Sequence, residues 1–277
     1  MNQSPRLRSH ALPRRRALGL SAGSLLALGL WPGALRAADV TGAGAFRFVV
    51  INDVHYRNEK CGMWLEKAFR QIKAAPNPPA FCLMAGDYSE NGTREELAAA
   101  RDAFKTLGIP VFGVIGNHDF LAKDDRRAYD EIFPARLNYR FEQHGWQFLA
   151  LDSTQGRLGS NTSIQPHTLR WVDEQIPKLD PKRPTVILTH FPLGPITPAR
   201  PANADALLER FKPINLQAVF SGHFHGFTER RFADAVLTTN CCCSAWRANH
   251  DFSKEKGWFA CEARDGRITR EFVAAAF

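Results

Sequence analysis

Five short segments of the sequence place histidine, aspartate or asparagine directly after an apolar run. The runs are FRFVVIN, FCLMAG, VFGVIG, VILT and AVFSG. The metal-binding residue types that follow them are Asp53, His55, Asp87, Asn117, His190, His223 and His225. Carboxylate, imidazole and amide oxygen together suit divalent ions such as manganese, iron or zinc. No cysteine belongs to the set, which argues against a structural zinc site.

The number of candidate ligands favours two metal ions over one. Seven ligands are too many for one tetrahedral ion, but they suit two ions that share a carboxylate about 3.5–4 Å apart. A single histidine after a strand is more often a structural residue, and a single aspartate there is usually a turn or cap residue. Here five of the nine histidines fall in the five segments, at positions 55, 118, 190, 223 and 225. That clustering favours a metal site.

The elements that must position these residues alternate between strands and helices. We expect strands at 46–51, 80–84, 110–115, 185–189 and 218–221, a hairpin of 139–141 with 146–151, and further strands at 231–238, 257–263 and 267–273. We expect helices at 62–74, 93–107, 124–132, 166–178 and 203–211, the second capped by Thr93 with Glu96 three residues later. The alternation predicts a mainly parallel, layered α/β core with a second sheet packed on it. Ligand sites in such sheets form beyond the carboxyl ends of strands, so the segments can converge.

The first 38 residues are typical of an export signal. Arg14, Arg15 and Arg16 precede an apolar run from 17 to 31, and small residues follow at 34–38. The paired arginines before Ala17 resemble a twin-arginine signal; an ordinary secretory leader or an uncleaved anchor is the alternative. We therefore expect a signal at 1–38, which would engage the export machinery, a catalytic domain at 39–277, and a periplasmic or secreted protein. No later segment reaches about 18 apolar residues, so no stable membrane span is expected after cleavage.

The basic charge of the sequence comes largely from this leader. The chain carries 36 basic and 28 acidic residues, and six arginines with no acidic residue lie within 1–37. The remainder holds 30 basic and 28 acidic residues, a balance of about +2. Without an arginine-rich stripe in the body, we expect no nucleic-acid partner.

Taken in order, the five segments resemble the calcineurin-like metallophosphoesterases over residues 47–226. The resemblance implies a four-layer α/β fold with two mixed β-sheets face to face and helices outside. It implies a first metal held by Asp53, His55 and His225, a bridging Asp87, and a second metal held by Asn117, His190 and His223. It also places His118 near the scissile bond, off the metals. A hydroxide bridging the two ions would attack a small phosphate mono- or diester.

Two further catalytic roles follow from this assignment. His118 would donate a proton to the leaving alkoxide or stabilise the transition state. Asp119 is a candidate to orient His118, as carboxylates commonly do for imidazoles near metals.

The residues after Asp87 narrow the substrate. Serine/threonine protein phosphatases of the superfamily carry arginine where Asn91 stands, and purple acid phosphatases carry a metal-binding tyrosine where Glu90 stands. Both of those activities are therefore disfavoured, and a cyclic-nucleotide phosphodiesterase or small-ester phosphatase is favoured. We place Asn91, Trp246 and Arg247 as candidate substrate-binding residues, with Trp246 stacking on a substrate ring and Arg247 meeting a phosphate.

Two other functional classes stay open from sequence. One is a metal-binding sensor that does not turn over, although it would not need His118. The other is a thiol redox protein built on Cys241, Cys242 and Cys243, for which the alternative is a packed strand end. A disulfide between Cys61 and this triplet is a hypothesis. A Rossmann-type nucleotide enzyme is disfavoured because no Gly-x-Gly-x-x-Gly follows the first strand.

Overall fold

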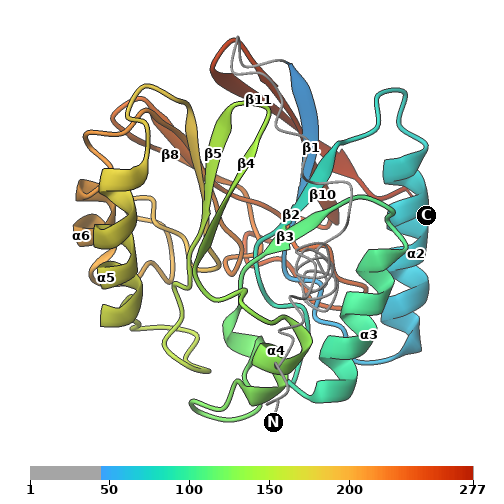
Figure 1. Ribbon diagram of the computed structural model, residues 1–277. Coiled ribbons are helices and arrows are strands. Elements are labelled where there is room, and N and C mark those ends of the chain that lie inside the picture. Colours follow the sequence, from blue (N-terminus) through green and yellow to red (C-terminus); the bar gives the residue numbers. More distant parts are fainter. Residues whose placement is uncertain (1–44, 277) are drawn as a thin grey trace, which may run out of the picture. The chain divides into compact units, whose positions relative to one another are not determined.

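A computed structural model describes residues 45–276 of the chain, and the expected export signal at 1–38 lies outside them. Within this part, two β-sheets pack against each other and helices cover their outer faces (Figure 1). The predicted four-layer arrangement of two mixed sheets flanked by helices is thereby confirmed. No described helix combines the length and apolar character needed to cross a membrane.

Each sheet has a parallel centre with antiparallel hairpins at its margins. The first sheet has the order β11-β10-β1-β2-β3, in which only β1, β2 and β3 are mutually parallel. Its strands are β1 (Phe46–Ile51), β2 (Phe81–Met84), β3 (Val111–Gly113), β10 (Gly257–Arg264) and β11 (Arg267–Ala274). Consecutive strand–helix units build the parallel part, and the C-terminal hairpin extends one edge.

The second sheet has the order β4-β5-β6-β7-β9-β8. Its strands are β4 (Tyr139–Gln143), β5 (Trp146–Ala150), β6 (Thr185–Leu188), β7 (Leu216–Phe220), β8 (Thr228–Phe232) and β9 (Ala235–Thr239). Strands β5, β6, β7 and β9 run parallel, while β4 and β8 pair antiparallel at the two edges. The predicted hairpin at 139–151 is confirmed. The single strand expected at 231–238 is wrong, because the chain turns at Ala233, where φ is 48°, and forms β8 and β9 instead.

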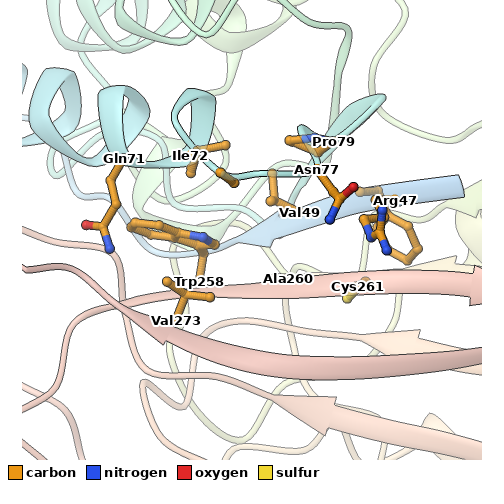
Figure 2. A pocket seen from close by; sticks show the side chains of 12 residues that line it. Arg47, Val49, Gln71, Ile72, Asn77, Pro79, Trp258, Ala260, Cys261 and Val273 are labelled. Atoms are coloured by element: carbon orange, nitrogen blue, oxygen red, sulfur yellow. The ribbon is translucent and has the colours of Figure 1, made fainter.

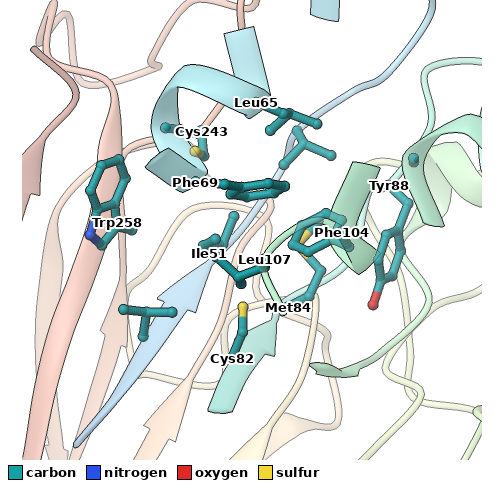
Figure 3. Packing of buried hydrophobic residues seen from close by; sticks show 14 of the residues in the cluster. Ile51, Leu65, Phe69, Cys82, Met84, Tyr88, Phe104, Leu107, Cys243 and Trp258 are labelled. Atoms are coloured by element: carbon teal, nitrogen blue, oxygen red, sulfur yellow. The ribbon is translucent and has the colours of Figure 1, made fainter. Parts of the chain in front are cut away.

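The central strands are apolar on both faces because both faces are covered. In β1, Phe46, Phe48 and Val50 pack between the sheets, whereas Val49 and Ile51 pack toward the helices. Side chains alternate across a strand, so a run such as FRFVVI serves two cores at once. Figure 3 shows the outer core, where Ile51 and Met84 meet Phe69 and Phe104 from two helices.

Three of the described helices pack on the outer face of the first sheet, and two others pack on that of the second. The first three are α2 (Glu59–Lys73), α3 (Arg94–Lys105) and α4 (Arg127–Ile132), and the other two are α5 (Pro166–Gln175) and α6 (Ala204–Glu209). Thr93 caps α3 as predicted, accepting a hydrogen bond from the Glu96 amide at 3.2 Å. The expected helix at 166–178 ends at Gln175 and continues as a short 3-10 turn (Ile176–Lys178), since Pro177 has no amide hydrogen to extend it.

Candidate metal centre

The structure brings all seven predicted ligands to one end of the two sheets. Each follows a strand of the parallel centre, and β1 and β2 lie in a different sheet from β6 and β7. Asn117 begins a short 3-10 turn, η2 (Asn117–Asp119), in the loop after β3. Backbone hydrogen bonds join the loops directly: the Asp53 amide donates to Gly86 O at 3.0 Å, and the Gly222 amide donates to His190 O at 3.0 Å.

The predicted ligands form two groups that share one carboxylate, and a third group of possible ligand atoms joins His55 to Glu90 and His118. Within each group, one candidate ligand atom per residue lies within 4.8 Å of all the others. The first group is Asp53, His55, Asp87 and His225, and the second is Asp87, His190 and His223. Asn117 joins the second group, because its Oδ1 lies 3.0 Å from His190 Nε2. Asp87 therefore stands where a bridging ligand is expected, with Oδ2 3.5 Å from His55 Nε2 and Oδ1 3.4 Å from His190 Nε2.

Most of these ligands lie on strained backbone. Five non-glycine residues of the cluster have positive φ, between 46° and 65°: Asp53, His55, Asp87, His223 and His225. Each such residue costs about 1 kcal/mol or more relative to ordinary backbone. The loops keep this geometry because hydrogen bonds and neighbouring loops hold them from several sides. Such strain is common where a functional site requires fixed side-chain directions.

The glycines before the ligands permit close approach between loops. A Cβ atom at Gly86 would lie 2.6 Å from His190 Nδ1, and one at Gly222 would lie 2.6 Å from Asp53 Oδ2. Real Cβ atoms do not come this close to other side chains. The Gly-Asp and Gly-His pairs of the sequence thus reflect a packing requirement inside the cluster.

The hydrogen bonds of the histidine rings fit a metal site. One ring nitrogen of each meets an oxygen: His55 Nδ1 meets Glu90 Oε2 at 2.9 Å, His190 Nδ1 meets Ala85 O at 2.9 Å, His223 Nε2 meets Gly159 O at 2.8 Å, and His225 Nδ1 meets Ala248 O at 3.1 Å. The other nitrogen of each ring then turns its lone pair into the cluster. The set matches the ligands that Mn, Fe and Zn accept, so the residues fit the expected ions.

Burial and charge set the protonation of the cluster. Burial lowers the pKa of His223 to about 3 and also lowers the pKa of His55, which leaves both rings neutral. Burial acts the same way on His225, but the Asp53 carboxylate 3.2 Å away outweighs it and holds the His225 pKa well above its usual value. A proton and a metal ion therefore compete for His225 Nε2.

His118 lies beside the cluster and outside both ligand groups. Its amide donates to Asp87 Oδ1 at 2.8 Å, its Nδ1 meets Glu90 O at 2.9 Å, and its side chain is 24% exposed. The Asp119 carboxylate is buried and accepts from the Gly116 amide at 2.9 Å and the Ser89 amide at 2.8 Å. Burial raises the Asp119 pKa to about 7. Asp119 thus stabilises the loop that carries His118 through hydrogen bonds to backbone amides. Among the described residues, no contact links the Asp119 carboxylate to the His118 side chain, although the sequence led us to expect one.

A second set of residues lines the approach to His118. Arg247 Nη2 lies 3.5 Å from His118 Nε2, and Arg247 forms a two-point ion pair with Glu90. Trp246 Nε1 donates to His55 O at 3.0 Å, and the Arg57 guanidinium lies 3.9 Å from the centre of the indole ring. Arg247 and Trp246 therefore lie close to His118 and His55, and their substrate-binding roles stay predictions.

Asn91 and Glu90 differ from the expectation. Asn91 is exposed, and its Nδ2 donates to Glu96 Oε1 at 2.8 Å, so its side chain points away from the cluster. The substrate-binding role assigned to Asn91 has no contact to support it. Sequence reasoning missed Glu90, which contacts His55, Arg247 and His118. The sequence signal that could have identified Glu90 as a site residue was its position three residues after Asp87.

One cavity and most of the cysteines lie apart from this chemistry, whereas the Cys242 side chain contacts His225. All six cysteines are free and buried, so the Cys61 disulfide is not formed, and Cys243 packs in the outer core near Phe69 (Figure 3). Burial raises the pKa of Cys241 to about 11 and that of Cys243 well above its usual value, which disfavours reactive thiolates. A cavity of about 90 Å³ between α2 and β10, lined by Arg47, Gln71 and Trp258, contains no residue of the cluster (Figure 2).

Two face-to-face sheets with a carboxylate–histidine cluster at their shared end define a metal-dependent phosphoesterase. The calcineurin-like phosphoesterase family matches residues 46–227, about two thirds of the chain, and the chain belongs to that family. A dimetal phosphatase from Danio rerio has the same fold, with a TM-score of 0.65 and 14% identity over 83% of this chain and 96% of that one. A purple acid phosphatase from yellow lupin also shares it, with a TM-score of 0.60 and 11% identity over 84% of this chain and 52% of that one.

The similar curated proteins include phosphodiesterases. The chain is 25% identical to the 3′,5′-cyclic adenosine monophosphate phosphodiesterase of Haemophilus influenzae over 217 residues, which cover 74% of this chain and 78% of that one. It is 27% identical to a 3′,5′-cyclic-nucleotide phosphodiesterase of Nostoc over 52% of this chain. The matched segments span only 43% and 54% of the Synechococcus and Nostoc relatives, about half their length.

Proposed function

We propose that the protein hydrolyses a small phosphate ester at two divalent metal ions. The observation that carries the proposal is that Asp87 belongs to both ligand groups and that His118 adjoins them. Asp53, His55 and His225 would hold one ion, Asn117, His190 and His223 the other, and Asp87 both. When bound, the ions would lower the pKa of a coordinated water and neutralise charge on the phosphoryl oxygens.

The chain's own groups supply the rest of the chemistry. The Glu90 backbone oxygen meets His118 Nδ1 and so orients the ring, with Nε2 turned toward Arg247 Nη2 at 3.5 Å. His118 is thus placed to give a proton to the leaving oxygen, and Arg247 to meet a phosphoryl oxygen. The backbone amide of His118 donates to Asp87 Oδ1 at 2.8 Å, the same oxygen that faces His190, and so fixes the orientation of the carboxylate.

Cyclic nucleotides are one substrate class that the relatives support. Two similar proteins are named as phosphodiesterases of 3′,5′-cyclic nucleotides, and Trp246 places an aromatic ring near the cluster. The Arg57 guanidinium over the indole, however, competes with a base for that ring face. We therefore propose a small phosphate ester as the substrate, with cyclic nucleotides as the first natural candidates to assay.

The test is hydrolysis of bis(p-nitrophenyl) phosphate and p-nitrophenyl phosphate by protein loaded with Mn, Fe or Zn. We expect a metal-dependent rate that falls at least a hundredfold in a His118→Ala variant with unchanged metal content. A protein that binds two metal equivalents and hydrolyses neither these esters nor a panel of natural ones would be a sensor or binder. Activity that survives chelation and is lost on thiol alkylation would instead support the redox alternative.

Export through the twin-arginine route is a separate proposal, and it rests on the sequence of residues 1–38 alone. Folded proteins use this route, so the metal centre would be filled before export. Replacing Arg14 and Arg15 with lysine should leave the precursor inside the cell, whereas delivery of this variant by the general secretory route would contradict the proposal.

A further inference from the structure

Glu90 lies between the metal-binding and substrate-facing parts of the site. Its Oε2 is 2.9 Å from Nδ1 of the ligand His55 and 3.7 Å from Nδ1 of His118. Its side chain is 16% exposed, so the carboxylate borders the open approach to the cluster. No other carboxylate of the described residues contacts the His118 ring.

The Glu90 carboxylate is ionised and is paired with Arg247. Its two carboxylate oxygens each accept a hydrogen bond from the Arg247 guanidinium, and a bidentate pair of this kind favours the charged carboxylate. Arg247 donates from Nε at 3.1 Å and from Nη2 at 2.5 Å. Arg247 is the guanidinium that reaches the His118 ring, and Glu90 therefore offsets its positive charge where a substrate would arrive.

The other arginines nearby do not contact this carboxylate. Arg157 Nη2 donates to the backbone oxygen of Glu90 at 3.2 Å, and Arg57 lies over Trp246. Arg247 is therefore the one arginine shown to pair with the Glu90 carboxylate among the described residues, and removing the carboxylate charge would leave Arg247 uncompensated beside His118.

The negative charge of Glu90 repels a phosphate ester more strongly when the ester itself carries more negative charge. Above pH 7 a phosphomonoester carries close to two negative charges, because its second pKa is near 6, whereas a diester carries one. Coulomb repulsion scales with the substrate charge, so a carboxylate a few ångströms away disfavours the monoester about twice as strongly in energy. The second substituent of a diester carries no charge, so the Glu90 carboxylate does not repel it.

We propose that Glu90 is a specificity-determining residue that selects singly charged phosphodiesters over doubly charged phosphomonoesters. The proposal rests on the proposed function, since it concerns the substrate class of the same site. Glu90 acts by charge and by holding Arg247, and it takes no part in bond making.

The test compares bis(p-nitrophenyl) phosphate with p-nitrophenyl phosphate at pH 8, because both release the same phenolate. The quantity measured is the ratio of kcat/KM for the diester to kcat/KM for the monoester. Glu90→Gln keeps the size and one hydrogen-bond acceptor but removes the charge, and we expect it to lower the ratio roughly tenfold. Arg247→Gln leaves the carboxylate uncompensated, so we expect it to raise the ratio while slowing both reactions.

The matched control is Glu131→Gln. Glu131 accepts a similar two-point ion pair from Arg94, from Nε at 3.0 Å and Nη2 at 2.6 Å, but it lies on α4 and touches no residue of the cluster. This variant should leave the ratio unchanged. Metal content and melting temperature of each variant show whether a change in rate reflects lost metal or lost fold.

A binding measurement separates this inference from the proposed function. Calorimetry measures the preference for singly over doubly charged ligands without turnover. The two ligands are phenylphosphonate, which is a dianion at pH 8, and its singly charged methyl ester. We expect Glu90→Gln to strengthen dianion binding relative to monoanion binding by a similar factor. A ratio within twofold of wild type in both assays would overturn the role of Glu90, even if the enzyme hydrolyses both esters. If neither these esters nor the panel of natural esters is hydrolysed, the proposed function fails, and the phosphonate pair still decides the role of Glu90.

Discussion

The Nε2 atoms of His55 and His225 face each other at 3.2 Å, while the Nδ1 atom of each ring meets an oxygen. With both Nδ1 atoms protonated and both rings neutral, two lone pairs would oppose each other in a buried space. A proton on one nitrogen or a cation between them relieves that repulsion. The Asp53 carboxylate favours such a proton on His225 when no metal is bound, and a bound metal ion would replace that proton and stabilise the folded site.

Removing the metal should destabilise the fold. If each ion is present at a hundredfold excess over its dissociation constant, it contributes about 2.7 kcal/mol to the free energy of unfolding. For a domain of this size, chelation should therefore lower the melting temperature by at least roughly 5 °C. Differential scanning fluorimetry with EDTA, followed by addition of Mn²⁺ in excess, measures this. A melting temperature that changes with neither EDTA nor Mn²⁺ would contradict a metal-stabilised cluster.

Replacing the shared carboxylate should affect both ions. Asp87→Asn removes one negative charge from two ligand groups at once, and we expect metal content to fall below one equivalent and hydrolysis to fall at least a hundredfold. Inductively coupled plasma mass spectrometry measures the stoichiometry. Asp152→Asn is the control: Asp152 is also buried and accepts from Thr154, but it belongs to neither group. Equal metal loss in both variants would argue against a bridging Asp87.

A methyl group at Gly86 should disrupt the cluster beyond its effect on the backbone. Gly86 has a φ of +85°, and an added Cβ would lie 2.6 Å from His190 Nδ1. Gly266 has a similar φ of +73° but open space around an added Cβ, so Gly266→Ala isolates the backbone cost of about 1 kcal/mol. We expect Gly86→Ala to lose metal affinity as well as stability. Matching melting curves and metal contents for the two variants would refute the steric argument.

Truncating Asn91 should have little effect on catalysis. Its side chain bonds to Glu96 at the surface, so Asn91→Ala should cost about 0.5–1.5 kcal/mol of stability and change KM less than twofold. Arg247→Gln is the contrast, with an expected rise in KM of about tenfold, because Arg247 lies 3.5 Å from His118. Steady-state kinetics with bis(p-nitrophenyl) phosphate decide this, and a tenfold rise in KM for Asn91→Ala would restore its predicted substrate-binding role.

The sequence by itself predicted the parallel strands and the residues at their ends. Apolar runs such as FRFVVI mark strands buried on both faces, and the polar residues that follow them must leave the sheet at its carboxyl edge. The Thr93 cap of α3 was predictable for the same reason, since it depends on residues a few positions apart. Strands and helix caps of this kind depend on residues that are close together in the sequence, so the sequence alone predicts them.

Only the tertiary structure decided which side chains share the site. Glu90 meets Arg247 across 157 positions, and no periodicity or spacing indicates that pair. Asn91, the next residue, turns outward to Glu96, and Cys243 packs into the outer core instead of the active site. The turn at Ala233 that divides the expected strand is likewise set by pairing of β8 with β9 and of β9 with β7. These outcomes depend on contacts between distant segments, and such contacts exist only once the two sheets have packed together.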